Sequence, residues 1–260
     1  MGDLKEIKQW RKKASPHIFA LEPRMLFAVS AASFTSINTD TGSSSTDFIT
    51  NDNTLTFSGT YTSGSSPNNL YLWLDTTRIT ASSISTSNSQ TNATWTYTYA
   101  TPISEGSHNI YLTTSTTSNS SGQLASHALV IDTSSPTTSL SSITPDLKAS
   151  SDSGVSNTDN ITEITTPTFT LSLNGIGGFS AGDFINLVDT SNANAVIGSY
   201  TILASDLTSG VWSSGDKDIN VTSALSYGVH TIKAQVSDVA GNTGTISSGL
   251  SVTIQDITAP

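Results

Sequence analysis

Aspartate is the side chain that recurs at matching positions in this sequence, in short polar phrases rich in serine, threonine and glycine. Two of the phrases, Asp-x-Gly-x-Ser-x-x-Asp and Asp-x-x-x-Pro, occur twice, and a Ser-Asp turn occurs in one copy only; their aspartates are Asp40, Asp47, Asp132, Asp152, Asp159, Asp238 and Asp256. Loop carboxylates and carbonyls are the oxygen ligands that Ca²⁺ prefers, about six to eight to each ion. Aspartate also stabilises turns by accepting hydrogen bonds from nearby backbone amides. The sequence therefore offers calcium binding and turn formation as two interpretations of the same residues.

Catalytic chemistry has few candidates in this chain. The sequence is rich in serine but contains no Gly-x-Ser-x-Gly phrase that would present a serine nucleophile. The carboxylates show no pairing beyond the recurring phrases, so no acid–base pair for glycoside hydrolysis stands out. The glycines of residues 175–182 lack the strand–helix setting of a phosphate loop, and the absence of cysteine removes thiolate chemistry. We predict that the protein is not an enzyme.

One histidine and one tryptophan recur at matching places. His108 and His230 each stand two residues after a glycine, at the entry to an expected strand. Because no second histidine or carboxylate lies at ligand spacing, we assign both to a structural or surface role. Trp95 and Trp212 each follow a turn, and we expect them to pack in a core or at an edge. A sugar-stacking platform is the alternative for the tryptophans.

Composition and charge exclude several classes of partner. Of the 260 residues, 35% are hydrophobic and 12% are charged, and the formal net charge is −10. The basic residues concentrate before residue 33, so the remainder is an acidic body that repels nucleic acid and favours cations. No apolar run is long enough to span a membrane. Disorder is the alternative for a serine-rich chain, and it is rejected here because the apolar residues alternate.

The elements that must position these residues come in two copies. Residues 40–50 match residues 152–162 at an offset of 112, the difference between 40 and 152. The offset grows later in the chain, where Trp95 matches Trp212, because loops are inserted. Each copy is therefore as long as a whole domain and longer than one coil of a solenoid. We predict a basic leader at residues 1–33, a first domain at 34–135 and a second domain at 136–260.

Hydrophobic residues alternate with polar ones within each copy. Phe169, Leu171 and Leu173 share one face of an expected strand, and residues 70–74 show the same alternation. Strands with a period of two, separated at short intervals by turns rich in glycine and asparagine, are typical of an antiparallel β-sandwich. We therefore predict an all-β fold of two antiparallel sandwiches in tandem, with no helix after residue 33.

The leader differs from everything that follows it. Residues 4–13 are predicted to form a short charged helix, and Glu22, Pro23 and Arg24 interrupt the apolar stretch that a signal peptide would need. The phrase Leu-Glu-Pro-Arg-Met-Leu at residues 21–26 resembles the LEPR-XLL motif found near the start of very large repetitive bacterial proteins. The match departs at Phe27, where the motif has leucine.

The order of phrases in the second copy resembles the bacterial Ig-like repeats of giant adhesins. It runs through Asp-x-Gly-x-Ser-x-x-Asp-x-Ile-Thr, Gly182-Asp183-Phe, Gly210-Val-Trp212, Tyr227-Gly-Val-His230 and Ser237-Asp238-x-Ala-Gly-Asn242. The first copy matches less well. Thr116 stands where the second copy has Asp238, and the Ala-Gly-Asn turn is missing.

The resemblance implies two tandem antiparallel immunoglobulin-like β-sandwiches in a secreted or cell-surface bacterial protein. They would act as a non-catalytic spacer whose partners are neighbouring repeats of the same chain and a host-surface glycan or protein. The resemblance also implies Ca²⁺ near the domain junctions, where it stiffens the rod, and the second copy is the better candidate because Asp238 has no counterpart in the first. The alternatives are a glycan- or protein-binding Ig-like module and an accessory domain of an exported polysaccharide-degrading enzyme.

Overall fold

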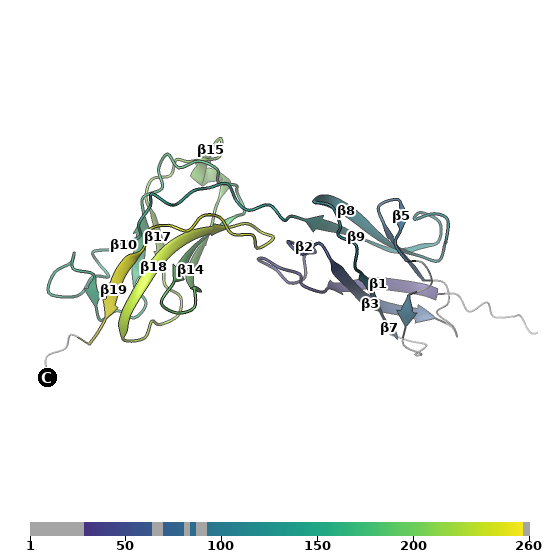
Figure 1. Ribbon diagram of the computed structural model, residues 1–260, viewed down its shortest axis with the longest axis horizontal. Helices are drawn as coiled ribbons and strands as arrows, with labels where there is room; N and C mark the ends of the chain where they lie inside the picture. Colours follow the sequence, from purple (N-terminus) through teal and green to yellow (C-terminus); the bar gives the residue numbers. More distant parts are fainter. Residues whose placement is uncertain (1–28, 64–69, 81–83, 87–92, 257–260) are drawn as a thin grey trace, which may run out of the picture.

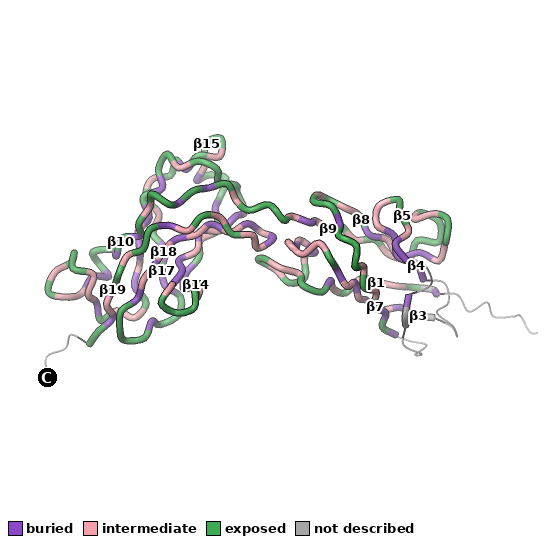
Figure 2. Tube along the Cα trace, in the orientation of Figure 1, coloured by how far each residue is buried: buried purple, intermediate pink, exposed green. Residues whose placement is uncertain are grey.

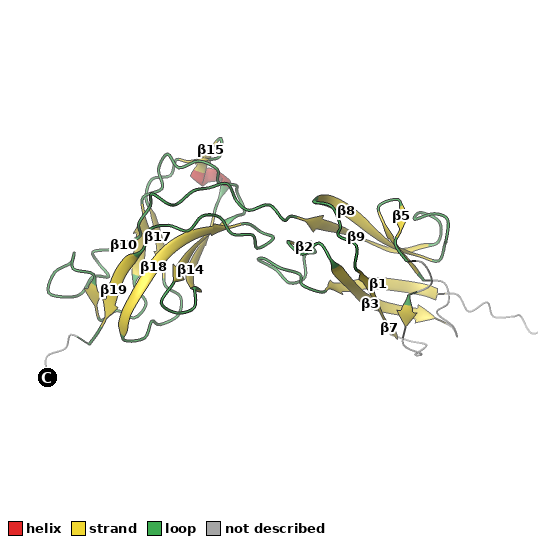
Figure 3. Ribbon diagram, viewed as in Figure 1, coloured by secondary structure: helices red, strands yellow, loops and turns green. Residues whose placement is uncertain are grey.

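The computed structural model describes residues 29–63, 70–80, 84–86 and 93–256. These residues form two β-domains that lie end to end and are joined by an extended linker (Figure 1). The 3-10 turn η1 at Ala204–Asp206 is the only helical element among them (Figure 3), and no described helix is long and apolar enough to cross a membrane. The predicted all-β fold of two tandem sandwiches is confirmed. The expected leader helix and the LEPR-XLL-like phrase lie outside the described residues.

The first domain consists of two sheets. One has the order β1-β3-β7-β6, with strands at Val29–Ile37, Leu55–Ser63, Ala93–Tyr99 and Ser85–Thr86. The other has the order β2-β9-β8-β4-β5, with strands at Ile49–Thr50, Gln123–Ile131, Gly106–Thr113, Tyr71–Leu74 and Thr77–Arg78. In β7, Ala93 and Trp95 are buried whereas Thr94 and Thr96 are exposed, which is the alternation that a half-buried strand requires.

The second domain repeats this plan with an added hairpin. One sheet has the order β10-β12-β17, with strands at Asp146–Leu147, Thr168–Leu171 and Lys217–Asn220. The other has the order β11-β19-β18-β13-β14, with strands at Ile161–Thr162, Leu250–Ile254, Gly228–Ser237, Phe184–Asp189 and Ala195–Thr201. The hairpin pairs β15 (Leu207–Thr208) with β16 (Val211–Trp212). Phe169 and Leu171 of β12 are buried, as their alternation predicted.

Each domain has its own hydrophobic core, and the two cores share no residue. Phe57 and Trp95 are among the fully buried side chains of the first core, and Phe169 and Trp212 are among those of the second. Figure 2 shows buried segments inside each domain and exposed segments along the linker and the outer loops. Burying one large apolar side chain contributes about 1.5–3 kcal/mol. Each domain therefore has an apolar interior that does not depend on the other.

A short parallel pair closes each domain in the same way. In the first domain β2 lies parallel to the end of β9, with Ile49 opposite Val130. In the second, β11 lies parallel to the end of β19, with Ile161 opposite Thr253. The aspartate-rich loop before each short strand is therefore held at the end of its domain where the last long strand leaves.

The division of the chain at residues 33/34 and 135/136 stays a prediction. Strand β1 begins at Val29, within the stretch that the sequence assigned to the leader.

Candidate functional site

The loop of the first domain that contains Asp40 and Asp47 is held by its own aspartates. The Phe48 N–H donates to Asp40 Oδ2 at 3.2 Å, and the Ile49 N–H donates to Asp47 Oδ1 at 3.1 Å. Phe48 has a φ of 61°, in the left-handed region that is unfavourable for a bulky residue. The bond from its amide to Asp40 helps to hold that conformation. Both aspartates therefore take part in turn formation.

The equivalent loop of the second domain repeats these bonds. The Asn160 N–H donates to Asp152 Oδ2 at 3.0 Å, and the Ile161 N–H donates to Asp159 Oδ1 at 3.2 Å. Asn160 has a φ of 59°, which asparagine adopts more readily than phenylalanine does. The two loops thus share these bonds from aspartate to backbone amide, as their matching sequences predicted, but Gly42 has a φ of +91° and its equivalent Gly154 does not have a positive φ.

Each loop also contains a buried carboxylate oxygen without a hydrogen-bond partner among the described residues. These atoms are Asp40 Oδ1 and Asp152 Oδ1, which occupy equivalent positions. Burial and the charge of Asp47 raise the pKa of Asp40, against the lowering effect of the Phe48 amide and of His127. An unpaired buried carboxylate oxygen is unfavourable, and either a proton or a cation would relieve it.

The loop of the first domain contacts a turn of the second domain directly. Thr41 Oγ1 donates to the Ala240 carbonyl at 2.6 Å, and the Ser43 N–H donates to the Val239 carbonyl at 3.1 Å. Gly42 lies between them with a φ of +91°, and a Cβ added there would stand 2.0 Å from Val239 O. Only glycine fits this close approach of two backbones.

The same turn is tied to the linker through Asn242. Its side-chain Nδ2 donates to the Asp132 carbonyl at 2.7 Å and to Asp238 Oδ2 at 2.9 Å. Its backbone N–H donates to Asp238 Oδ1 at 2.9 Å. Asn242 therefore joins the aspartate of the turn to the aspartate at which the linker begins.

Asp183 is the residue of this junction that the aspartate phrases did not identify. It is 8% exposed, and burial together with the charges of Asp238 and Asp132 raises its pKa to about 6, despite a lowering hydrogen bond from the Ser180 backbone. The sequence signal was the phrase Gly182-Asp183-Phe, which we used only as a family feature. The junction therefore concentrates negative charge from three separate parts of the chain.

The structure distributes the predicted calcium ligands between the two ends of the second domain. Asp132 and Asp238 lie at the junction, next to the loop of Asp40 and Asp47, whereas Asp152 and Asp159 lie in the equivalent loop beside the end of β19, after which Asp256 follows. Within residues 29–256, as far as they are described, no group of three or more His, Cys, Asp or Glu side chains is arranged to hold a metal ion. Calcium binding by these residues stays a prediction.

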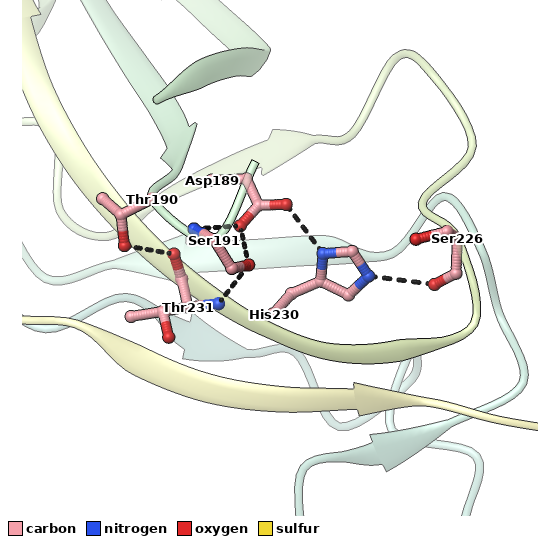
Figure 4. A network of polar contacts seen from close by, with 6 residues as sticks. All are labelled: Asp189, Thr190, Ser191, Ser226, His230 and Thr231. Atoms are coloured by element: carbon pink, nitrogen blue, oxygen red, sulfur yellow. Dashed lines mark hydrogen bonds and ion pairs between the residues drawn. The ribbon is translucent and has the colours of Figure 1, made fainter. Parts of the chain in front are cut away.

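His230 lies in a polar network that the sequence did not reveal (Figure 4). Its Nδ1 is 2.7 Å from Asp189 Oδ2, and its Nε2 is 2.9 Å from the Ser226 carbonyl oxygen. Ser191 Oγ donates to the other oxygen of Asp189 and accepts the Thr231 N–H at 3.3 Å. Both nitrogens of the imidazole face oxygen acceptors, so each position favours an N–H donor and neither nitrogen is free to act as a general base.

The first domain contains the same arrangement in a more exposed form. His108 Nδ1 is 2.8 Å from Asp75 Oδ2, and its Nε2 is 2.8 Å from the Ser104 carbonyl oxygen. Burial lowers the pKa of each histidine, but the bonds to aspartate and carbonyl outweigh it, and the pKa of both His108 and His230 is raised. The structural role is clear in each domain, and the partner aspartates were missed because they lie on a different strand or turn.

Both tryptophans belong to the cores. Trp95 and Trp212 are each 1% exposed. Trp95 Nε1 donates to the Ser33 carbonyl at 3.1 Å, and Trp212 Nε1 donates to the Gly215 carbonyl at 2.6 Å. A buried indole with a satisfied N–H cannot present a face to a sugar. The sugar-stacking alternative is therefore wrong for these two residues.

Two β-sandwiches with matching loops and a bonded junction define a tandem β-sandwich protein. The family model described as Bacterial Ig-like domain matches residues 29–133 and again residues 139–256. These matches cover most of the chain, which therefore belongs to the bacterial Ig-like domain family. The predicted family resemblance is confirmed at this level, while the LEPR-XLL-type motif stays a prediction. No curated protein matches the chain.

Several solved structures are similar to this chain. The fibronectin(III)-like modules of Clostridium thermocellum CbhA share 13% identity at a TM-score of 0.31, over 77% of this chain and 85% of that one. The Bacteroides ovatus protein SGBP-B, solved with a mixed-linkage heptasaccharide, shares 14% identity at a TM-score of 0.25, over 82% of this chain and 46% of that one. A Ca²⁺-stabilized adhesin that helps an Antarctic bacterium to bind ice shares 16% identity at a TM-score of 0.28, over 87% of this chain and 49% of that one. The chain spans about half the length of the last two.

Proposed function

We propose that this chain is a non-catalytic structural spacer in a bacterial cell-surface adhesin, where rigid Ig-like modules extend another part of the protein away from the cell. The bonded junction supports this proposal. Thr41 and Ser43 of the first domain donate to backbone carbonyls of the second, and Asn242 donates to the linker at Asp132. Direct bonds between consecutive domains oppose the relative motion that a bare linker would allow.

A distance measurement across the junction tests the spacer. Because the chain has no cysteine, spin labels can be placed selectively at Thr116→Cys and Ser251→Cys, two exposed positions in different domains. Double electron–electron resonance should give one narrow distance distribution. Gly42→Ala should broaden it, because the new Cβ meets Val239 O.

Gly154→Ala is the matched control for that variant. Gly154 is the equivalent loop glycine of the second domain, and a Cβ there meets Ile161 O of its own domain at 2.7 Å. The control strains a loop without touching the junction, so the distribution should stay narrow. A broad distribution in the unmodified chain would overturn the spacer proposal.

Calcium forms a second part of the proposal. We propose that Ca²⁺ binds at the ends of the second domain, where the predicted aspartates lie. Two observations favour a cation there: the unpaired buried oxygens of Asp40 and Asp152, and the repulsion of buried Asp183 by the charges of Asp238 and Asp132. A dissociation constant of ~10⁻⁴ M at roughly millimolar free Ca²⁺ would stabilise the folded state by about 1.4 kcal/mol.

Calorimetric titration with Ca²⁺ and thermal melting with and without EDTA test this part. We expect saturable binding and a melting temperature that falls when EDTA removes the ion. Asp238→Asn should weaken binding, whereas Asp146→Asn, at an exposed position on β10, should not. Absence of heat and of any EDTA effect would eliminate calcium while leaving the spacer intact.

A binding module is the alternative function, and one feature of the second domain favours it. Tyr227, Val229 and Val196 are large apolar side chains that are 68%, 63% and 60% exposed, and all three line one hollow. An exposed tyrosine beside polar groups suits a sugar or a protein segment. Reproducible binding on a glycan array, abolished by Tyr227→Ala, would displace the spacer.

An accessory role in an exported polysaccharide-degrading enzyme is the remaining alternative. It predicts retention of the chain on insoluble polysaccharide, which the same Tyr227→Ala variant would lose. A spacer shows no such retention.

A further inference from the structure

Four asparagines in this chain begin an Asn-x-Ser/Thr sequence, the motif in which a side-chain amide can accept a sugar. They are Asn92, Asn119, Asn160 and Asn220. The motif is short, and a chain rich in serine and threonine contains it often by composition alone. Asn92 lies outside the described residues, but the surroundings of the other three show which of them a sugar transferase can reach.

Asn119 is not available for such a reaction. It is half-buried, and its side-chain Nδ2 donates to the Asp75 carbonyl at 2.7 Å. The carboxylate of the same aspartate accepts the Asn109 N–H at 2.8 Å and pairs with His108, so this carbonyl belongs to a well-bonded turn. A sugar on Nδ2 of Asn119 would have to displace the contact with that turn.

Asn160 is excluded by the third residue of its motif. Thr162 is 0% exposed, and its Oγ1 lies 3.0 Å from Ser153 Oγ and accepts the Ile164 N–H at 3.0 Å. Asn160 itself is half-buried, with its backbone amide bonded to Asp152. A transferase that recognises the hydroxyl of the motif therefore cannot reach it in the folded chain.

Asn220 differs from both. It is the last residue of β17 and is exposed, Thr222 is exposed as well, and Val221 between them is buried. This alternation is that of an extended segment, in which the first and third residues point to the same side. The amide and the hydroxyl of the motif are therefore presented to solvent together.

The side chain of Asn220 is also oriented for the reaction. Thr168 Oγ1 donates to Asn220 Oδ1 at 2.8 Å, and among the described residues no hydrogen bond from Nδ2 is seen. Thr222 Oγ1 donates to the Ile197 carbonyl at 3.2 Å, which leaves the lone pairs of the hydroxyl as acceptors. The nitrogen that would accept a sugar is thus held in place and free.

The position of Asn220 in its sheet gives a sugar a physical role. β17 ends the strand order β10-β12-β17, and no further described strand pairs with it, whereas β6 pairs with the equivalent strand β7 of the first domain. An open edge strand can pair with another chain, and a bulky hydrophilic group at Asn220 would oppose such pairing. The equivalent residue of β7 is Thr98, which is bonded to Thr56 as Asn220 is to Thr168, and no Asn-x-Ser/Thr sequence begins there.

We propose that Asn220 is an N-glycosylation site. Its Nδ2 attacks the anomeric carbon of a sugar that is activated by a phosphate ester to a nucleotide or to a lipid carrier. The new C–N bond replaces the C–O bond to phosphate, the phosphate leaves with the bonding electron pair, and one amide proton passes to a base of the transferase. The modification belongs to the second domain and does not depend on the spacer proposal.

Two transferase reactions on the purified chain test the site and distinguish the donors. One uses UDP-glucose with a soluble asparagine glucosyltransferase, and the other uses an undecaprenyl-pyrophosphate-linked oligosaccharide with a membrane oligosaccharyltransferase. Trypsin then cleaves after Lys148 and Lys217, so that Asn119, Asn160 and Asn220 fall in separate peptides, and mass spectrometry locates the sugar. We expect Asn220 to be modified by at least one donor and the other two asparagines to remain unmodified.

The tryptic peptides provide the unfolded reference, because they contain the same motifs without the tertiary structure. All three asparagines should be modified in the peptides. Within the folded chain, Thr222→Val removes the hydroxyl of the motif and should abolish modification of Asn220, whereas the matched variant Thr222→Ser should retain it. Both changes are made at an exposed residue, and an unchanged melting temperature shows that the fold is intact.

Four results would overturn the inference. The first is an unmodified Asn220 in the folded chain with both donors, and the second is modification that persists in Thr222→Val. The third is equal modification of Asn119 or Asn160 in the folded chain, because the local structure would then not select the site. The fourth is a bare peptide beginning at Asp218 in the chain isolated from its own bacterium, where we expect that peptide to carry the sugar.

Discussion

Asp183 is the group at the junction whose charge is most unfavourable, and its replacement by asparagine gives a quantitative test of the site. The side chain is 8% exposed and lies near Asp238 and Asp132, and its pKa is raised from 3.8 to about 6. Because the folded chain holds this proton more tightly than the unfolded chain, stability falls as the pH rises from about 4 to 6. Above pH 6 Asp183 is ionised in both the folded and the unfolded chain, so its full destabilising effect on the folded chain is present.

The size of the effect follows from the pKa. The shift is about two pH units, and each unit is worth about 1.4 kcal/mol. Asparagine cannot ionise, so Asp183→Asn should raise the free energy of unfolding by about 1–3 kcal/mol at pH 7.5 in calcium-free buffer. At pH 4 the two proteins should differ little, since Asp183 is then protonated in the folded chain.

Thermal and urea unfolding between pH 4 and pH 8 measure this difference. A gain of 1 kcal/mol corresponds to a rise of roughly 4 °C in the melting temperature of a domain of this size. Asp146→Asn, an exposed aspartate on β10 of the same domain, is the matched control and should leave the pH profile unchanged. Parallel profiles for Asp183→Asn and the unmodified chain from pH 5 to pH 8 would refute the electrostatic reasoning.

Three further variants test other parts of the structure. His230→Gln should lower the free energy of unfolding by about 1–3 kcal/mol, because it breaks the pair with Asp189. The pKa of the histidine is raised above 6.5 and that of the aspartate is lowered below 3.8, so urea unfolding should show the largest loss of stability between pH 3.8 and pH 6.5. An equal loss at pH 9 would contradict the pairing. Trp212→Ala should lower the free energy of unfolding by about 3–5 kcal/mol, because it leaves a cavity in the second core and removes the donor of the Gly215 carbonyl. Calorimetry should show a large drop in the melting temperature of the second domain only. Asn242→Ala should broaden the interdomain distance distribution, and an unchanged width would show that its amide does not hold the junction.

The strands and the repeat could be predicted from the sequence because both depend on local order. Alternation at Phe169 and Leu171 places apolar side chains on one face of any extended segment, whatever the strand pairs with. The matching phrases at residues 40–50 and 152–162 predicted equivalent loops, and both loops have the same bonds from aspartate to backbone amide. Turn formation uses partners within a few residues, so it is also local.

The charge pairs and the junction were decided by tertiary structure alone. Asp189 meets His230 because β13 and β18 pair in one register, which sets Asp189 opposite Ile232; no spacing along the chain specifies that register. Asp183 acquires its raised pKa only in the folded chain, which buries the carboxyl group and brings it near Asp238 and, with a smaller effect, near Asp132 of the linker. Aspartate is the residue type that first pointed to a site here, and calcium binding by these aspartates stays a prediction. Which of its carboxylates face one another depends on how distant strands and consecutive domains pack, and that is information a local pattern does not contain.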